Sequence, residues 1–218
     1  MTLKQVVDEI LDARRTVPPE RSVLTAISGI DAGGKGYFTE RLEAELQRLG
    51  VNAVAIGVDS WLNIDRFDPS DPEGPVEHYY NNSIRFEEMF SETILPLREN
   101  RSLQVEIDYA DELSTEYERR TLTFNDVDVI LQEGVYLLKR IFRPYYDRTV
   151  WIDCTFETAL QRAITRGQEG LPPQETTRDY ANIYNLAQRL HFQRDEPQGT
   201  ASVVVNNDGL LGEVVWGG

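Results

Sequence analysis

The chain has 218 residues, of which 40% are hydrophobic and 27% are charged. This length and balance predict one α/β domain with a full core rather than two domains. The formal net charge is -15, which argues against general binding to nucleic acid or to an anionic membrane, because both attract positive charge. Cys154 is the single cysteine, so no disulfide can form within the chain, and we expect a protein of the reducing cytoplasm.

An amphipathic helix is predicted first, over residues 2–15, where apolar side chains recur at helical spacing. It ends before Pro18 and Pro19, which cannot continue a helix. The segment is too highly charged to resemble a signal peptide. The apolar side of this helix predicts packing on a core. Its exposed side could form a dimer contact, but a monomer fits the sequence equally well, so the oligomeric state stays open.

A glycine-rich turn separates an apolar strand at residues 22–27 from a helical pattern that runs to Leu49. The turn contains Gly29, Gly34 and Lys35 at the spacing G-x-x-x-x-G-K, which is typical of a phosphate-binding loop. Amides in such a turn and at the following helix N-terminus can face an anion, and Lys35 adds a mobile cation. We expect the nucleotide to contact this whole segment, namely Gly29, Asp31, Ala32, Gly33, Gly34, Lys35, Gly36 and Tyr37.

The residue after Lys35 departs from this pattern. The pattern has Ser or Thr there, because the hydroxyl ligates magnesium. This chain has Gly36. The sequence therefore predicts nucleotide binding more firmly than it predicts catalysis of the usual kind.

Strands and helices alternate along the rest of the chain. We expect strands at residues 51–58, 127–132, 148–152 and 201–205, helices at residues 84–97, 135–142, 156–166 and 177–192, an irregular loop at residues 62–83, and a hairpin of strands at residues 103–109 and 116–124. This order is typical of an α/β fold with a five-stranded parallel sheet and helices on both faces, here with a small β-hairpin and a lid. Residues 1–218 then form a single domain, with an insertion at about 60–125 and a lid at about 166–176.

Polar residues close each predicted core strand, and ligands of parallel sheets bind beyond the carboxyl ends of the strands. These residues are Asp31, Asp59, Glu133, Asp153 and Asn206. Asp59, facing the gap between the first and second strands, is our candidate base for a substrate hydroxyl and a possible magnesium ligand. Glu133 is the candidate Walker-B-like magnesium carboxylate. A turn former at Asp59 and a helix cap at Glu133 are the structural alternatives.

Arg162 and Arg166 are four residues apart on the predicted helix that leads into the lid. That spacing places both on one face, where they could clamp phosphates and act in catalysis together with Lys35 and Asp59. The alternative is a pair of exposed arginines on a solvated helix.

Candidate contacts to the acceptor lie in the insertion. They are Trp61, Tyr79, Tyr80, Asp108 and Tyr109, with Asp59 as the reacting partner. A packed aromatic side chain is the commoner role of tyrosine. His78 and His191 have no partner at metal-ligand spacing, so neither predicts a metal site.

Five segments in order resemble the uridine kinase-like branch of the P-loop kinases. They are GIDAGGK from Gly29, VDSW from Val58, GPVEHYYNNSIRFEEM from Gly74, VILQEGVYLL from Val129 and ALQRAITR from Ala159. The resemblance covers roughly residues 20–208. Such an ordered set is far more specific than a phosphate-binding loop alone.

This resemblance implies an enzyme that uses ATP and Mg²⁺ to phosphorylate a hydroxyl of a small molecule, most simply a nucleoside such as uridine or cytidine. It matches Asp59 to the family's base, Glu133 to its metal site, and Arg166, with Arg162, to its lid arginines. Gly33 and Gly36 depart from the family, which has a small or hydroxylated residue and then Ser or Thr there. A sugar or vitamin precursor as acceptor, and a degenerate nucleotide-binding protein that regulates a partner without turnover, remain open.

Overall fold

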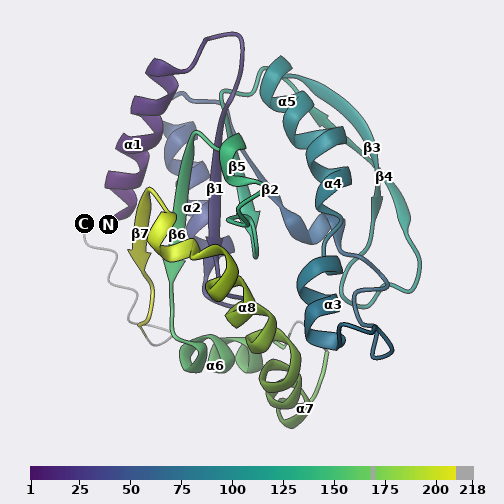
Figure 1. Cartoon of the computed structure of the whole chain (residues 1–218). Helices are drawn as coiled ribbons and strands as arrows, with labels where there is room; N and C mark the ends of the chain where they lie inside the picture. Colours follow the sequence, from purple (N-terminus) through teal and green to yellow (C-terminus); the bar gives the residue numbers. More distant parts are fainter. Residues whose placement is uncertain (168–169, 210–218) are drawn as a thin grey trace.

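The computed structural model describes residues 1–167 and 170–209. In this part of the chain, five parallel strands form the central sheet in the order β2-β5-β1-β6-β7 (Figure 1). The strands are β1 (Val23–Gly29), β2 (Ala53–Gly57), β5 (Val129–Gly134), β6 (Arg148–Asp153) and β7 (Val203–Asn206). Every residue of β1 is buried, including Thr25 and Ser28, as is typical of a central strand in a sheet covered on both faces. The predicted parallel sheet is confirmed.

Helices cover both faces of this sheet and enclose two apolar cores. One core joins the sheet to α1 (Leu3–Thr16) and α2 (Lys35–Arg48). The other joins it to α3 (Pro75–Asn82), α4 (Phe86–Glu88), α5 (Leu95–Asn100), α6 (Phe156–Arg166) and α8 (Asn185–Asp195). α7 (Pro173–Asp179) precedes α8, and α9 (Pro197–Thr200) follows it. No helix in residues 1–167 and 170–209 has the length and apolar character needed to cross a bilayer.

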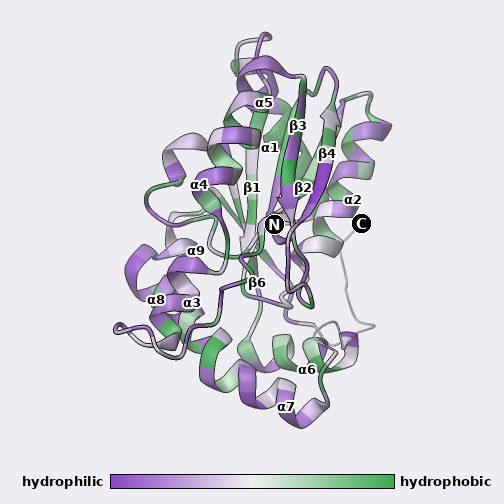
Figure 2. Ribbon diagram, turned by 90° about the vertical axis from the view of Figure 1, so that its right-hand side faces the viewer, coloured by the Kyte–Doolittle hydropathy of each residue, from purple (hydrophilic) through white to green (hydrophobic). Residues whose placement is uncertain are grey.

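The insertion ends in a two-stranded antiparallel sheet of β3 (Leu103–Tyr109) and β4 (Glu118–Phe124). Its register runs from Leu103 opposite Phe124 to Tyr109 opposite Glu118. β3 alternates between exposed and inward-facing residues, while β4 is mostly exposed, and Figure 2 shows hydrophilic colour along much of the pair. The hairpin lies beside α5 and confirms the prediction.

Three local predictions need correction. Residues 62–83 are not irregular throughout, because α3 starts at Pro75, a residue suited to the first helical position. Residues 135–142 form turns and no helix, since Tyr136 has a φ of 61°, which a right-handed helix cannot contain. The predicted helices at 84–97 and 177–192 are continuous but contain π-helical segments at Met89–Ile94 and Tyr180–Tyr184.

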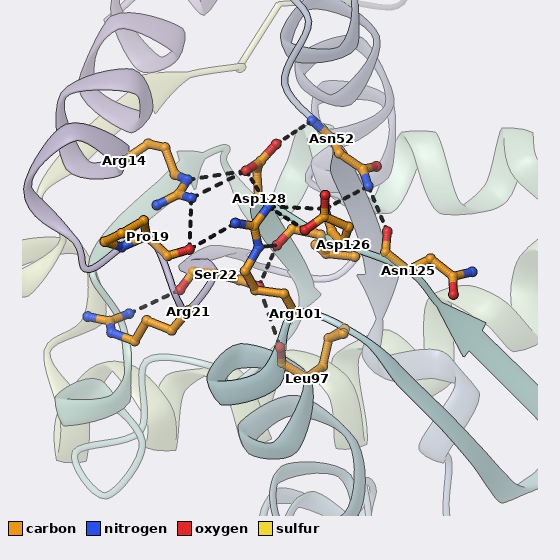
Figure 3. Close-up of polar contacts among 11 residues, drawn as sticks. Arg14, Pro19, Arg21, Ser22, Asn52, Leu97, Arg101, Asn125, Asp126 and Asp128 are labelled. Carbon is orange, nitrogen blue, oxygen red and sulfur yellow. Dashed lines mark hydrogen bonds and ion pairs between the residues drawn. The ribbon is translucent and has the colours of Figure 1, made fainter.

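At the amino ends of the strands, a polar network ties the sheet to its surroundings (Figure 3). Asp128, just before β5, accepts hydrogen bonds from Arg101 Nη2 at 2.8 Å, Asn52 N at 3.0 Å and Arg14 Nε at 3.4 Å. Arg101 also donates to Pro19 O at 2.8 Å, and Ser22 Oγ donates to Val127 O at 2.8 Å. Nearly every donor in this network has an acceptor within it, so this end of the sheet is fixed by mutually satisfied charges.

Candidate active site

The predicted phosphate-binding loop connects β1 to α2 and opens into a cavity of about 520 Å³. Its tight turn is closed by a hydrogen bond from Gly33 N to Ile30 O at 3.1 Å. Gly34 precedes the first residue of α2 with a φ of 91°, a conformation that favours glycine. No side chain caps the helix, so its first amides remain available to an anion.

Six of the eight residues expected at the nucleotide line the cavity. Those that line it are Asp31, Ala32, Gly34, Lys35, Gly36 and Tyr37. Gly29 and Gly33 do not line it. A Cβ on Gly29 would lie 2.7 Å from Ile152 O, so this glycine is required by the close approach of β6. The two glycines therefore shape the loop rather than touch its ligand.

Two carboxylates and Lys35 meet at the carboxyl end of the sheet. Asp59 lies in the 3-10 turn Val58–Trp61 directly after β2, and Glu133 lies near the end of β5. Lys35 Nζ is 3.9 Å from Glu133 Oε1 and donates to Ile30 O at 2.9 Å. Because β5 lies between β1 and β2, Asp59 does not face a gap between those two strands, as the sequence suggested, but lies next to Glu133.

Gly134 allows this pairing of carboxylates. A Cβ at this position would come within 2.3 Å of Val58 Cγ2, which is closer than real side-chain carbons approach. The bare backbone of Gly134 therefore lets the end of β5 pack against the turn that carries Asp59.

The electrostatics of the pair are unfavourable without a ligand. Burial raises the pKa of Glu133 to about 7, and the nearby charges of Asp59 and Asp31 add to this effect, while Lys35 and Arg166 oppose it. Asp59 contacts solvent in the cavity, yet the surrounding walls displace enough water that desolvation raises its pKa as well, against the attraction of Lys35. Perturbed carboxylates of this kind are typical of functional sites.

The donor set suits a magnesium ion that keeps several waters. Asp59 and Glu133 supply carboxylate oxygens, and a divalent cation would stabilise the charged forms that burial disfavours. No cluster of three or more Asp, Glu, His or Cys side chains suited to a metal occurs in residues 1–167 and 170–209. A Cβ at Gly36 would meet nothing within 4 Å, so the usual hydroxyl is absent although there is space for it.

The two arginines of α6 occupy different environments. Arg162 is buried, and its guanidinium donates to the carbonyls of Gly33 at 3.2 Å, Asn207 at 2.8 Å and Gly209 at 2.7 Å. Arg162 lines the cavity, but these hydrogen bonds tie its guanidinium to the protein backbone, and its role as a phosphate clamp stays a prediction. Arg166 is exposed, lines the cavity, and acts electrostatically on Asp59 and Glu133.

An aromatic wall forms the opposite side of the cavity. Tyr79 stacks on Phe67 with ring centroids 5.3 Å apart, and it meets Tyr184 edge-on at 5.2 Å. Arg66 lines the same side, and its guanidinium donates to Asn63 O at 3.2 Å and Glu112 O at 2.6 Å. The other side chains here are Leu62, Ile84, Glu112 and Tyr136. This half of the cavity combines planar apolar surfaces with a few polar groups.

Four predicted acceptor residues do not reach this cavity. Trp61 is fully buried in the core. Tyr80 is buried and donates its hydroxyl to Asp195. Asp108 and Tyr109 lie on the hairpin, where Asp108 pairs with Arg119 at 3.2 Å and Arg120 lies over the ring of Tyr109. Of the three tyrosines predicted to contact the acceptor, only Tyr79 lines the cavity.

Sequence reasoning missed several residues of the wall. Arg66 and Glu112 lie in loops without a recognisable motif, while Tyr184 and Gln188 lie four apart on one helical stretch. Tyr136 lies within the segment that carried the family resemblance and could have been found from it. The predicted lid at about 166–176 includes residues 168–169, which lie outside the described residues.

The sequence matches no protein-family model and no curated protein, but the structure resembles solved structures over nearly its whole length. A possible uridine kinase from Bacillus stearothermophilus matches with a TM-score of 0.65 at 21% identity, covering 92% of this chain and 98% of that one. A candidate fructose transport system kinase from Silicibacter sp. TM1040 matches with a TM-score of 0.70 at 18% identity, covering 94% of this chain and 99% of that one. D-glycerate 3-kinase from Cryptococcus neoformans matches with a TM-score of 0.67 at 12% identity, covering 96% of this chain and 97% of that one.

The fold is that of the uridine kinase-like P-loop kinases. In this uridine kinase-like fold the phosphate-binding loop, Asp59 and Glu133 share one cavity. The names of the three matched proteins include a nucleoside, a sugar and a hydroxy acid, so the fold alone does not select an acceptor.

Proposed function

We propose that this protein is an ATP-dependent phosphotransferase that moves the γ-phosphate to a hydroxyl of a small molecule. The observation that carries the proposal is the meeting of Lys35, Asp59 and Glu133 at one cavity with the uncapped start of α2. Phosphoryl transfer needs an anion cradle, metal ligands, an acceptor base and mobile cations. Each of these has a residue at this cavity.

The residues divide the work as follows. Amides of the loop and of the first turn of α2 hold the outer phosphates, and Lys35 neutralises them. Mg²⁺, when bound through Asp59, Glu133 and water, neutralises charge on the phosphates. Asp59 accepts the acceptor's proton, because its carboxylate lies at the cavity, in the turn directly after β2. Arg166, exposed at the cavity, neutralises the transferring phosphoryl group.

A nucleoside is the acceptor that we favour. Tyr79 and Tyr184 line the cavity and offer ring surfaces on which a base can stack, and Phe67 supports the ring of Tyr79. The carboxylates of Asp31 and Asp59 disfavour an acidic acceptor such as glycerate. A sugar or vitamin precursor remains the alternative. We also propose a cytoplasmic location. A homodimer stays a prediction, and α1 would have to contribute its exposed face, because its apolar face packs on the core.

A metabolite screen tests the proposal. Purified protein is incubated with ATP, Mg²⁺ and single nucleosides, sugars and hydroxy acids, and ADP is counted against a reaction without acceptor. We expect acceptor-dependent ADP with at least one nucleoside. ATP binding without acceptor-dependent ADP for any compound would instead support the second candidate, a regulatory nucleotide-binding protein, which the missing hydroxyl at Gly36 favours.

A further inference from the structure

Two sets of buried side chains hold the phosphate-binding loop; Gln188 and Arg162 also line the cavity, whereas Tyr180 and Asn207 do not. On one side, Tyr180 donates its hydroxyl to Asp31 Oδ2, and Asp31 N donates to Gln188 Oε1 at 2.7 Å. Tyr180 is 1% exposed and Gln188 is 4% exposed. The backbone amide of Asp31 is therefore used within the protein and is not offered to a ligand.

The orientation of Gln188 is itself fixed. Its Nε2 donates to Tyr184 O at 3.2 Å, so its Oε1 must face the loop. Tyr180 and Tyr184 bound the π-helical segment, and Gln188 follows in α8. π-Helical turns occur often at functional sites, where they set the direction of side chains. One helical stretch thus delivers both groups to Asp31.

On the other side, Gly33 O accepts hydrogen bonds from Asn207 Nδ2 at 2.7 Å and Arg162 Nη1 at 3.2 Å. The peptide unit is planar and trans, so its C=O and N–H groups point in opposite directions. With Gly33 O held against Arg162 and Asn207, the N–H of Gly34 points away from them. That direction lets it join the amides that face a phosphate.

A strained residue lies between the two contacts. Ala32 has a φ of 52°, a left-handed conformation that is unfavourable for a residue with a Cβ. Such strain persists only where the surroundings over-determine the backbone. Here Asp31 is fixed before Ala32 and Gly33 after it, which supplies that constraint.

We propose that Tyr180 and Gln188 on one side, with Arg162 and Asn207 on the other, are positioning residues that hold the loop in its anion-binding shape before nucleotide arrives. This inference rests on the proposed function, since it concerns the same phosphate site. Preorganised donors bind more tightly because no ordering cost remains at the moment of binding. Removing the hydroxyl of Tyr180, which does not line the cavity, lets Ala32 relax and weakens phosphate binding without removing a group that faces the phosphate site.

The primary test is Tyr180→Phe, which removes a hydroxyl and keeps the packed ring. We expect its Kd for ATP, measured by calorimetry, to rise about tenfold, the scale for a hydrogen bond to a charged group. Inorganic triphosphate should lose affinity by the same factor, because the loop binds phosphates and not the base. Gln188→Met, which removes the acceptor for Asp31 N, is a second variant with the same expectation.

Tyr146→Phe is the matched control. It removes a hydroxyl that donates to Gln132 Oε1 at 2.9 Å in the core, and it touches no residue of the loop. We expect its thermal stability to fall with no change in either Kd. Equal loss of affinity in Tyr146→Phe and Tyr180→Phe would show a general effect of destabilisation and overturn the inference.

A double-mutant cycle separates positioning from unrelated damage. If Tyr180 acts through Asp31, Tyr180→Phe should add no further loss of affinity in an Asp31→Ala background. Additive losses of affinity would overturn the inference and leave the proposed function standing. Unchanged ATP affinity in both Tyr180→Phe and Gln188→Met would do the same. Failure of the wild-type protein to bind ATP overturns the proposed function, and the inference with it.

Discussion

The two ends of strand β5 carry acidic side chains in opposite circumstances. Asp128, before the strand, accepts hydrogen bonds from Arg101, Asn52 and Arg14 (Figure 3). Glu133, near its other end, has Lys35 Nζ 3.9 Å away, and burial raises its pKa to about 7 against the attraction of Lys35 and Arg166. The same strand therefore ends in a satisfied network on one side and in an unsatisfied cluster on the other.

A second pair of carboxylates repeats the contrast. Burial alone would raise the pKa of Asp147 at the amino end, but hydrogen bonds from Arg21 and from Leu24 N outweigh it and lower that pKa. For Asp59 at the carboxyl end, desolvation prevails and raises the pKa. Contacts that stabilise the fold are therefore concentrated at the amino ends of the strands. The carboxyl ends keep buried negative charges that a cationic ligand can neutralise.

The strongest test of this comparison is Asp59→Asn, at the unsatisfied rim. If Asp59 is the base, we expect turnover to fall by about 10²- to 10⁴-fold, the usual contribution of a general base. The Kd for ATP measured without Mg²⁺ should change little, since the loop and Lys35 are untouched. Initial rates and calorimetry measure the two quantities. Unchanged turnover would remove Asp59 from the base role.

At the satisfied rim, Arg101→Ala should act on stability instead. It removes donors to Asp128 and to Pro19 O, and we expect a loss of about 3 kcal/mol in the free energy of unfolding, as for a largely buried ion pair broken on one side. Denaturant melts measure this loss. Arg119→Ala, which breaks an exposed pair, is the matched control and should show almost none. A loss of activity in folded Arg101→Ala protein would contradict the comparison.

Glu133→Gln sharpens the comparison through its pH dependence. The pKa of Glu133 rises from 4.5 in the unfolded chain to about 7 in the fold, so the folded state binds the extra proton between these values. Wild-type stability should therefore fall as pH rises through this window, whereas the variant should not respond at this position. We expect the variant to be more stable by about 2 kcal/mol at pH 8 and no more stable at pH 4. A constant difference between melts at the two pH values would refute this.

The smallest effect is expected from Gly36→Ser, which restores the missing hydroxyl. A Cβ there meets nothing within 4 Å, so stability should hardly change. The Kd for ATP should fall by up to about tenfold with Mg²⁺ and stay the same without it. Gly199→Ser, at another open position, controls for the substitution itself. No gain with Mg²⁺ would mean that the metal does not approach the start of α2.

Local chemistry explains what could be predicted from the sequence. The turn before α2 is recognisable because Gly29, Gly34 and Lys35 have a fixed spacing along the chain. Asp59 and Glu133 could be placed at one rim because parallel strands bring their carboxyl ends together. Both inferences need only the order of elements, which the sheet confirms.

The features that could not be predicted from the sequence depend on neighbours distant along the chain. Arg162 has the spacing of a clamp, but its guanidinium is occupied by carbonyls of Gly33, Asn207 and Gly209, which come together only in the fold. Residues 135–142 have buried apolar side chains at helix-like spacing, yet the left-handed Tyr136 breaks the helix. The burial of Trp61 likewise follows from packing, since nothing beside Asp59 in the sequence sets its direction.

The absent side chain of Gly134 has a practical consequence. Any larger residue there would act as a wedge against Val58 and would widen the gap between Asp59 and Glu133 without altering either of them. A graded series of substitutions at this position could thus serve as a spacer set, reporting how far apart the two acids can move before the chemistry stops.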